Sequence, residues 1–274
     1  MENIKDYQKA GDDLYHKLHL PTYPVAIKYI KDLSEIPDGV IRPSAQGQKW
    51  SLCQAITSAR RWGWHVAMTA DDNFCVPASA LHRWVEVSPE HVIESQVRQG
   101  WHRNGEAEAR RFQVILEFIG KENLTKLVGY IGFICSPLPD TLVVPDTVCA
   151  YGSGAQVMHI IHALSYDAKH TPRSYFEGFE EACFKGGFLP FASNIPQIVV
   201  PGMGDRSFGG VEDHEIAVGF PGTLLSYVTE NLFKTGEYMN IGQPLKKLFP
   251  MNLTEKLTPG FDYLHQRIQE HKKK

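Results

Sequence analysis

Short apolar segments typical of strands alternate irregularly with amphipathic stretches typical of helices, and this pattern constrains the fold most. β-Branched and aromatic residues predict strands within 24–30, 63–70, 126–139, 141–152 and 197–200, and one at 84–87. Apolar residues three or four positions apart predict helices at 3–19, 51–62, 89–102 and 105–120, and another from 154 onward. No run of strict strand–helix–strand units is present. The order therefore favours an α+β fold with mixed sheets and interspersed helices.

The last third of the chain carries three further predictions. The segment "SYFEGFEEACFKGGFLP" predicts a helix of about ten residues that ends at Gly186–Gly187 and holds Cys183 near its C-terminal end. The segment "QIVVPGMGDRSFGGVEDHEIAVGFP" predicts a strand and then a glycine-rich loop that holds Asp205 and Arg206. A short acidic helix is expected after this loop.

Length and composition favour one compact domain over residues 1–274. The chain has 274 residues, of which 43% are hydrophobic, and this is enough for one large core. Two lobes that meet near residues 120–150 are the alternative, but no long Pro, Gly or Ser linker separates them. Residues 245–274 are expected to form a C-terminal helical tail.

Charge and hydropathy argue against two classes of partner. The net charge is −3, and no long basic stripe with interleaved aromatic residues is present, so we expect no nucleic-acid partner. No segment approaches the roughly 20 apolar residues that span a bilayer, and we expect no membrane partner. The N-terminal "MENIKDYQKAGDD" has charges where a secretory signal needs an apolar run, which predicts a cytoplasmic protein.

Five cysteines are the residues most open to chemistry. An odd number of cysteines in a large chain without a secretory signal argues against a disulfide framework. Cys135 and Cys149 lie inside apolar segments, where a free cysteine behaves as a small core residue. Cys53 lies in a predicted helix and Cys75 in a loop just after a predicted turn. The spacing itself leaves these as core thiols, metal ligands or nucleophiles.

Six segments of the chain, in order, resemble a known family. They are "LPTYPVAIKYI", "CQAITSARRWGW", "DNFCVPASAL", "GAQVMHIIHAL", "FEEACF" and "VPGMGDRSFGGVEDHEIAVGFP". Together they resemble the domain-of-unknown-function family 169, described as uncharacterised ArCR-type proteins, over residues 14–235 or so. The resemblance puts weight on Cys53, Cys75 and Cys183, and not on Cys135 or Cys149.

This sequence departs from the family pattern in two places. A glycine usually follows closely after the second cysteine, whereas here the loop continues Val76-Pro77-Ala78. At the start of the predicted helix near residue 154, this chain has Gly152-Ser153-Gly154, whereas the family pattern usually has an Asn-Pro pair. The first departure concerns the loop around Cys75, and the second weakens an anion site at the start of that helix.

Three cysteines from distant segments favour an iron–sulfur cluster. Structural zinc usually takes close pairs such as CxxC, which this sequence lacks, whereas clusters accept scattered thiolates that the fold brings together. We expect Cys53, Cys75 and Cys183 to hold a 4Fe-4S cluster with one iron open. An open iron acts as a Lewis acid, so lyase, hydratase or sulfur-transfer chemistry on a small anionic molecule is expected.

Four further side chains are candidates for roles in that reaction. Arginine binds carboxylates and phosphates in two-point fashion, so Arg206, with Asp205, is expected to orient the anion. His65 or His82 is expected to donate a proton. Two alternatives stay open. One is a non-catalytic module that binds a haem, a corrinoid or another hydrophobic ligand, and the other is a thiol-dependent enzyme without a metal.

Overall fold

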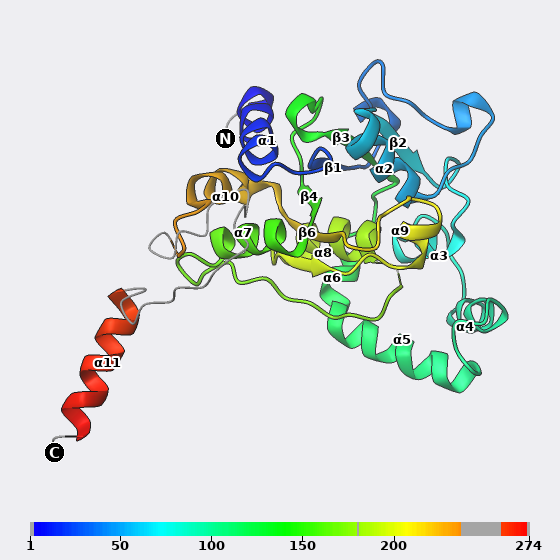
Figure 1. Cartoon of the computed structure of the whole chain (residues 1–274). Coiled ribbons are helices and arrows are strands. Elements are labelled where there is room, and N and C mark those ends of the chain that lie inside the picture. Colours follow the sequence, from blue (N-terminus) through cyan, green and yellow to red (C-terminus); the bar gives the residue numbers. More distant parts are fainter. Residues whose placement is uncertain (1–2, 180, 237–258, 273–274) are drawn as a thin grey trace.

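Six strands form a single antiparallel sheet at the centre of the molecule (Figure 1). The computed structural model describes residues 3–179, 181–236 and 259–272. The sheet order is β2-β3-β1-β4-β6-β5. The α+β prediction is confirmed, with the strands paired antiparallel in one sheet rather than in mixed sheets. The strands are β1 (Val25–Ile30), β2 (Val66–Thr69), β3 (Gly132–Pro137), β4 (Thr147–Gly152), β5 (Gln197–Val199) and β6 (Ile216–Pro221).

Helices cover both faces of this sheet. Successive side chains of a strand point to opposite faces, and both faces carry apolar side chains that the helices bury. On one face, Ala26 of β1 packs in a core with α1 (Ile4–Leu18), α7 (Gly154–Leu164) and α10 (Leu225–Asn231). On the other face, Ile27 packs in a core with α2 (Leu52–Trp62) and the π-helix η4 (Glu181–Phe188). Cys135 and Cys149 are fully buried in this second core, as the sequence predicts.

The remaining helices are short or lie at the margin of the sheet. The helices α4 and α5 pack on each other at one corner of the molecule, at the lower right of Figure 1. None of the helices in the described ranges has the length and apolar character needed to cross a bilayer. Of the predicted tail 245–274, residues 245–258 lie outside the described residues, and α11 lies within the rest. These helices are α3 (Val76–Leu81), α4 (Pro89–Arg98), α5 (Gly105–Ile119), α6 (Lys121–Thr125), α8 (Leu189–Ser193), α9 (Met203–Ser207) and α11 (Pro259–Lys272).

The helix η4 corrects the prediction that Gly186–Gly187 ends a helix. It continues through both glycines to Phe188, where α8 begins, and Cys183 lies near its start. The glycines serve close packing instead of termination. A Cβ atom at Gly186 would lie 3.4 Å from the Cys149 sulfur, and one at Gly219 of β6 would lie 1.9 Å from the Gly186 carbonyl oxygen. The backbone of η4 therefore lies directly on the sheet.

This close approach predicts that Gly219→Ala is strongly destabilising. The new methyl group would overlap the Gly186 carbonyl, and overpacking of this kind costs about 1–3 kcal/mol or more. The control is Gly154→Ala, where the nearest atom would be 3.8 Å away and alanine suits the first turn of α7. Urea denaturation measures both variants. Equal midpoints for the two would contradict the close packing of η4 on β6.

Two other predicted elements are also corrected. Residues 84–87 form a loop between α3 and α4 instead of a strand, and the Trp84 ring packs on the His82 ring with centroids 5.1 Å apart. Inward packing of this one tryptophan accounts for the strand-like alternation. The acidic segment after Gly210 is a turn that leads into β6, not a helix, because its carboxylates bind arginines. Asp205 and Arg206 belong to the short helix α9 and not to a loop.

Candidate functional site

Cys53, Cys75 and Cys183 line one pocket, which we call the thiol pocket, although they come from three distant segments. Cys53 lies in the first turn of α2, Cys75 directly precedes α3, and Cys183 lies in η4. The cavity has a volume of about 210 Å³, and all three cysteines are free thiols. The structure thus brings together the three cysteines that the sequence singles out. Other residues around the cavity include Leu52, Pro77, Trp101, Phe179, Glu181, Met203, Asp205 and Phe208.

Local hydrogen bonds hold the first two cysteines in place. The Ser51 side chain accepts the Gln54 N–H at 3.1 Å, and the Gln54 side chain accepts the Ser51 N–H at 2.8 Å, which fixes the start of α2. Asn73 accepts the Cys75 N–H at 3.0 Å and donates to the Cys75 carbonyl at 2.8 Å. The side-chain amide of Asn73 therefore fixes the backbone of Cys75 before α3 begins.

The Cys53 thiol contacts both Cys183 and a buried carboxyl group. Its hydrogen bond with Cys183, its burial and the nearby Asp205 carboxylate raise the pKa of Cys53 well above the ordinary thiol value. A raised pKa keeps the thiol protonated at neutral pH, and a protonated thiol is a poor nucleophile. Cys53 is therefore a protonated thiol at neutral pH in the absence of a bound group.

Asp205 connects two of the elements that carry cysteines. Its carboxylate accepts the N–H of Gly202 at 2.9 Å and the N–H of Ala182 in η4 at 3.2 Å. Burial raises the pKa of Asp205, while these N–H groups and Cys53 act in the opposite direction. Its oxygen atoms are thus engaged by the protein. Asp205 holds α9 against η4 and lies beside Cys53.

Glu181 is a pocket residue that the sequence analysis misses. Its Oε1 atom accepts the Gly178 N–H and the Lys185 ammonium, each at 2.9 Å. Its Oε2 atom is buried and has no hydrogen-bond partner. Burial raises the pKa of Glu181 although Lys185 lowers it. The spacing of Glu181 from Lys185, four residues, signals a helical ion pair, but the sequence does not show that this pair is buried.

Lys185 belongs to a buried group of charges behind the pocket. Its ammonium lies 3.0 Å from a carboxylate oxygen of Glu177, whose other oxygen lies 2.9 Å from Arg111. Arg111 also pairs with the fully buried Glu108 at 2.8 Å. These side chains connect η4 to α5. Buried charges of this kind require partners, because an unpaired charge in a low-dielectric interior is costly.

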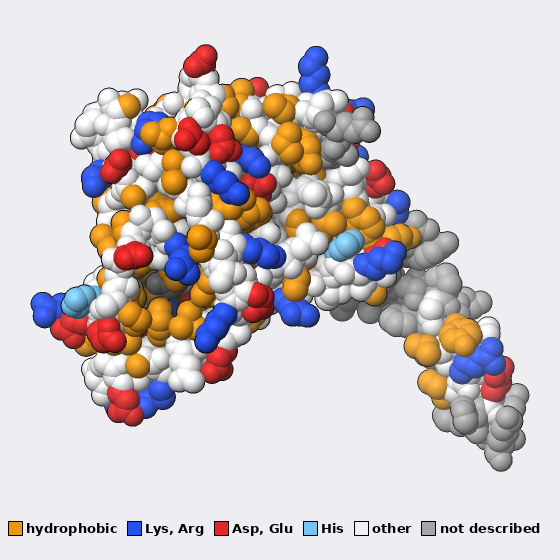
Figure 2. All heavy atoms as spheres, turned by 180° about the vertical axis from the view of Figure 1, so that it is seen from behind, with side chains coloured by type: hydrophobic (Ala, Val, Ile, Leu, Met, Phe, Trp, Pro, Cys, Tyr) orange, Lys and Arg blue, Asp and Glu red, His pale blue; other side chains and the backbone are white. Residues whose placement is uncertain are grey.

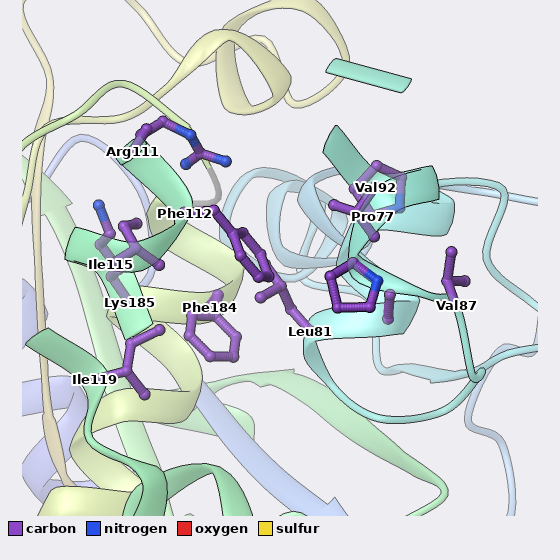
Figure 3. Close-up of a pocket in the computed structure, with 12 residues that line it drawn as sticks. Pro77, Leu81, Val87, Val92, Arg111, Phe112, Ile115, Ile119, Phe184 and Lys185 are labelled. Atoms are coloured by element: carbon purple, nitrogen blue, oxygen red, sulfur yellow. The ribbon is translucent and has the colours of Figure 1, made fainter. Parts of the chain in front are cut away.

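A second, apolar pocket of about 100 Å³ shares Pro77 with the thiol pocket and is also lined by Lys185 (Figure 3). Phe112, Ile115 and Ile119 of α5 point toward Phe184 of η4 across this space (Figure 3). It holds no cysteine, so we assign the chemistry to the thiol pocket. Near Cys75 the thiol pocket adjoins a cleft of about 440 Å³ between α3 and α4. Figure 2 shows hydrophobic side chains gathered at this corner, beside α4 and α5.

The two histidines expected to donate protons lie outside the lining of the thiol pocket. His82 is fully buried among aromatic rings, with its Nδ1 atom 2.9 Å from the Ala78 carbonyl oxygen. Burial lowers the pKa of His82 to about 4, so its ring is neutral at neutral pH. His65 at the start of β2 lies 3.1 Å from the Ser136 hydroxyl and 3.6 Å from Asp140. Neither ring lines the thiol pocket, although the His82 ring interacts with the backbone of Cys183.

Arg206 is also absent from the described residues that line the pocket. Its guanidinium donates to the carbonyl groups of Pro201 at 3.2 Å and Glu212 at 3.1 Å, and it pairs with Asp213 at 3.3 Å. Arg206 thus stabilises its own segment. No lysine or arginine is among the described residues lining the thiol pocket, whereas Glu181 and Asp205 are. The lining gives no support to an anionic ligand.

Within the described residues, no three His, Cys, Asp or Glu side chains are arranged around a point where one metal ion would bind. A site for a single ion would need its ligands to converge on that point. The pocket is therefore characterised by its three thiols, two of which, those of Cys53 and Cys183, are in hydrogen-bond contact.

Comparisons with known proteins give a family but no activity. A family model described as DUF169, uncharacterised ArCR, matches residues 13–231. The chain is similar to the uncharacterized protein MJ0308 of Methanocaldococcus jannaschii, with 21% identity over 230 residues that cover 83% of this chain and 94% of the relative. No solved structure matches the chain. The chemistry must therefore be argued from the pocket itself.

Proposed function

This chain belongs to the DUF169 family of uncharacterised ArCR proteins, and we propose that it is an iron–sulfur protein whose cluster is held by Cys53, Cys75 and Cys183. The observation that carries the proposal is the presence of these three thiols, from α2, the start of α3 and η4, in one pocket. Sulfur ligands are soft and select iron–sulfur centres over hard cations. Cys135 and Cys149, buried in the core, stay outside this set.

The protein groups around the thiols suit such a centre. Asp205 holds η4 and α9 together beside Cys53, so two of the ligands are fixed relative to each other. Apolar side chains such as Leu52 and Phe208 form part of the pocket lining. With three cysteines, a 4Fe-4S cluster would keep one iron without a cysteine ligand, and that iron would supply Lewis-acid chemistry of the lyase, hydratase or sulfur-transfer type.

A cleft beside the pocket supports a route for substrate entry. The cleft between α3 and α4 reaches Cys75 and is lined by apolar side chains such as Phe74, Val87 and Val92. Gln99, from the residues that follow α4, lines both the cleft and the thiol pocket. A small molecule that passes along α4 would therefore meet Cys75 first.

Anaerobic reconstitution tests the proposal. Protein produced and reconstituted without oxygen is expected to be brown, to contain iron and sulfide in near-equal amounts, and to bleach in air. Metal analysis and visible absorption measure this result. Protein that holds zinc alone, or no metal after careful reconstitution, would rule out the cluster.

A second candidate function follows from the contact between Cys53 and Cys183. Two thiols in contact can form a disulfide, passing two electrons and two protons to a disulfide oxidant. The raised pKa of Cys53 works against this reaction, because the thiolate is the reactive form. Treatment of metal-free protein with oxidised glutathione, followed by peptide mapping, tests it. A Cys53–Cys183 disulfide that forms rapidly at neutral pH would favour this candidate over the cluster.

A further inference from the structure

One carboxylate oxygen of Glu181 is buried without a hydrogen-bond partner. Its Oε1 atom accepts hydrogen bonds from Gly178, Glu177 and Lys185, at 2.9, 3.3 and 2.9 Å. Its Oε2 atom accepts none, although the side chain is 1% exposed. A buried carboxylate oxygen without a partner is costly. Because Glu181 lines the thiol pocket, a ligand there can supply the missing donor.

The charges near Glu181 favour a cation as that ligand. In the described part of the buried charge group, three carboxylates, of Glu108, Glu177 and Glu181, face two fixed cations, Arg111 and Lys185, and Glu108 also pairs with His102. Asp205 adds a fourth buried acidic group at the pocket, and no lysine or arginine is among the described residues that line it. A positive group in the pocket would compensate this excess, whereas an anion would increase the repulsion.

The walls of the pocket favour an organic cation over a hydrated inorganic ion. Trp101 and Phe179 lie edge to face with centroids 5.1 Å apart, and both line the pocket. The Arg111 guanidinium already lies over the Phe179 ring, 4.9 Å from its centroid, so Trp101 is the ring available to a bound cation. Leu52, Met203 and Phe208 add apolar surface. Aromatic faces attract cations, and apolar walls stabilise a ligand that carries hydrocarbon next to its charge.

We propose that the thiol pocket binds a small organic ammonium ion, with its N–H groups on Glu181 Oε2 and its hydrocarbon part against Trp101 and Phe179. The inference rests on the proposed function for the place of the ligand, beside the three cysteines. Its charge argument uses protein groups alone. It therefore applies to the metal-free protein.

Three probes with the same ring test the proposal: benzylammonium, benzyl alcohol and benzoate. They are titrated by calorimetry into the full-length metal-free protein, so the result does not depend on cluster assembly. We expect benzylammonium to bind about tenfold more tightly than benzyl alcohol or better, since its positive charge adds Coulomb attraction to the carboxylate that the neutral alcohol lacks. Benzoate is expected to bind most weakly. Benzoate bound as tightly as benzylammonium, or no binding of any probe, would overturn the proposal.

Glu181→Gln and Glu177→Gln form a matched pair of variants. Both glutamates are buried and pair with Lys185, but only Glu181 lines the pocket. The preference for benzylammonium over benzyl alcohol should disappear in Glu181→Gln and persist in Glu177→Gln, and the affinity for both probes should stay unchanged in Glu177→Gln. A preference that survives Glu181→Gln, or is lost equally in both variants, would overturn the role of Oε2. Failure to assemble a cluster would leave these outcomes intact and would count against the proposed function alone.

Discussion

Changing Cys53, Cys75 or Cys183 to Ser is expected to abolish cluster assembly. Each thiolate would bind a different iron, so loss of one ligand leaves that iron without its soft donor. Even changes to residues behind metal ligands lower metal affinity by about 10–100-fold, so loss of a ligand itself should cost at least as much. Iron and sulfide content after identical anaerobic reconstitution measures the effect.

The two core cysteines provide the controls. Cys135 and Cys149 are fully buried, and neither lines the thiol pocket. Cys135→Ala and Cys149→Ala should retain the cluster and lose only packing, about 0.5–1.5 kcal/mol by comparison with Ile→Val changes. Equal loss of iron in all five variants would indicate general unfolding and would contradict a specific three-cysteine site.

Glu215→Gln is expected to destabilise the fold more than any surface change. Both oxygens of Glu215 accept from Arg60, at 2.6 and 3.0 Å, and the Arg60 guanidinium stacks 4.3 Å from the centre of the Tyr151 ring. Arg60 is fully buried, so removal of its carboxylate partner leaves an uncompensated charge. Breaking a buried pair in this way costs about 3–5 kcal/mol. Urea denaturation at pH 7 measures the loss.

The pH dependence of that pair has a definite sign. Burial alone would raise the pKa of Glu215, but hydrogen bonds from Arg60 and from the Glu212 N–H lower it overall, below the ordinary value of 4.5. Its stabilisation is therefore complete above pH 4.5 and is lost as the pH falls toward the folded-state pKa. Glu215→Gln should remove this part of the acid sensitivity.

The control for Glu215→Gln is Asp13→Asn, at an exposed ion pair with Lys17. This variant should lower the free energy of unfolding by about 1 kcal/mol or less.

The elements around the thiol pocket could largely be predicted from the sequence. The strand β1 and the helix α2, which carries Cys53, lie where the residue pattern predicts them. Both have strong local signals, an alternation of buried residues in one case and a capping box at Ser51 in the other. The burial of Cys135 in the core could also be predicted, because the apolar segment around it is visible in the sequence.

Contacts between distant segments explain what the sequence could not show. Gly186 ends a helix by local rules, yet here it lies against Gly219, 33 positions away, and a π-helix continues through it. Arg206 has the chemistry of an anion clamp, but its guanidinium is used by Pro201, Glu212 and Asp213. Glu181 has the composition of a solvent-facing residue. Its burial depends on α9 and on the segment around Gly178.

The three cysteines are each held by a separate device: a capping box before Cys53, the Asn73 amide at Cys75, and glycine packing under η4 at Cys183. None of these devices uses a ligand. Folding of this chain is therefore expected not to depend on an occupant of the pocket, in contrast to a zinc finger, which is unfolded without its metal. In that case the binding free energy of an occupant would not be consumed in folding the chain, and it would remain available for affinity and for selection among ligands.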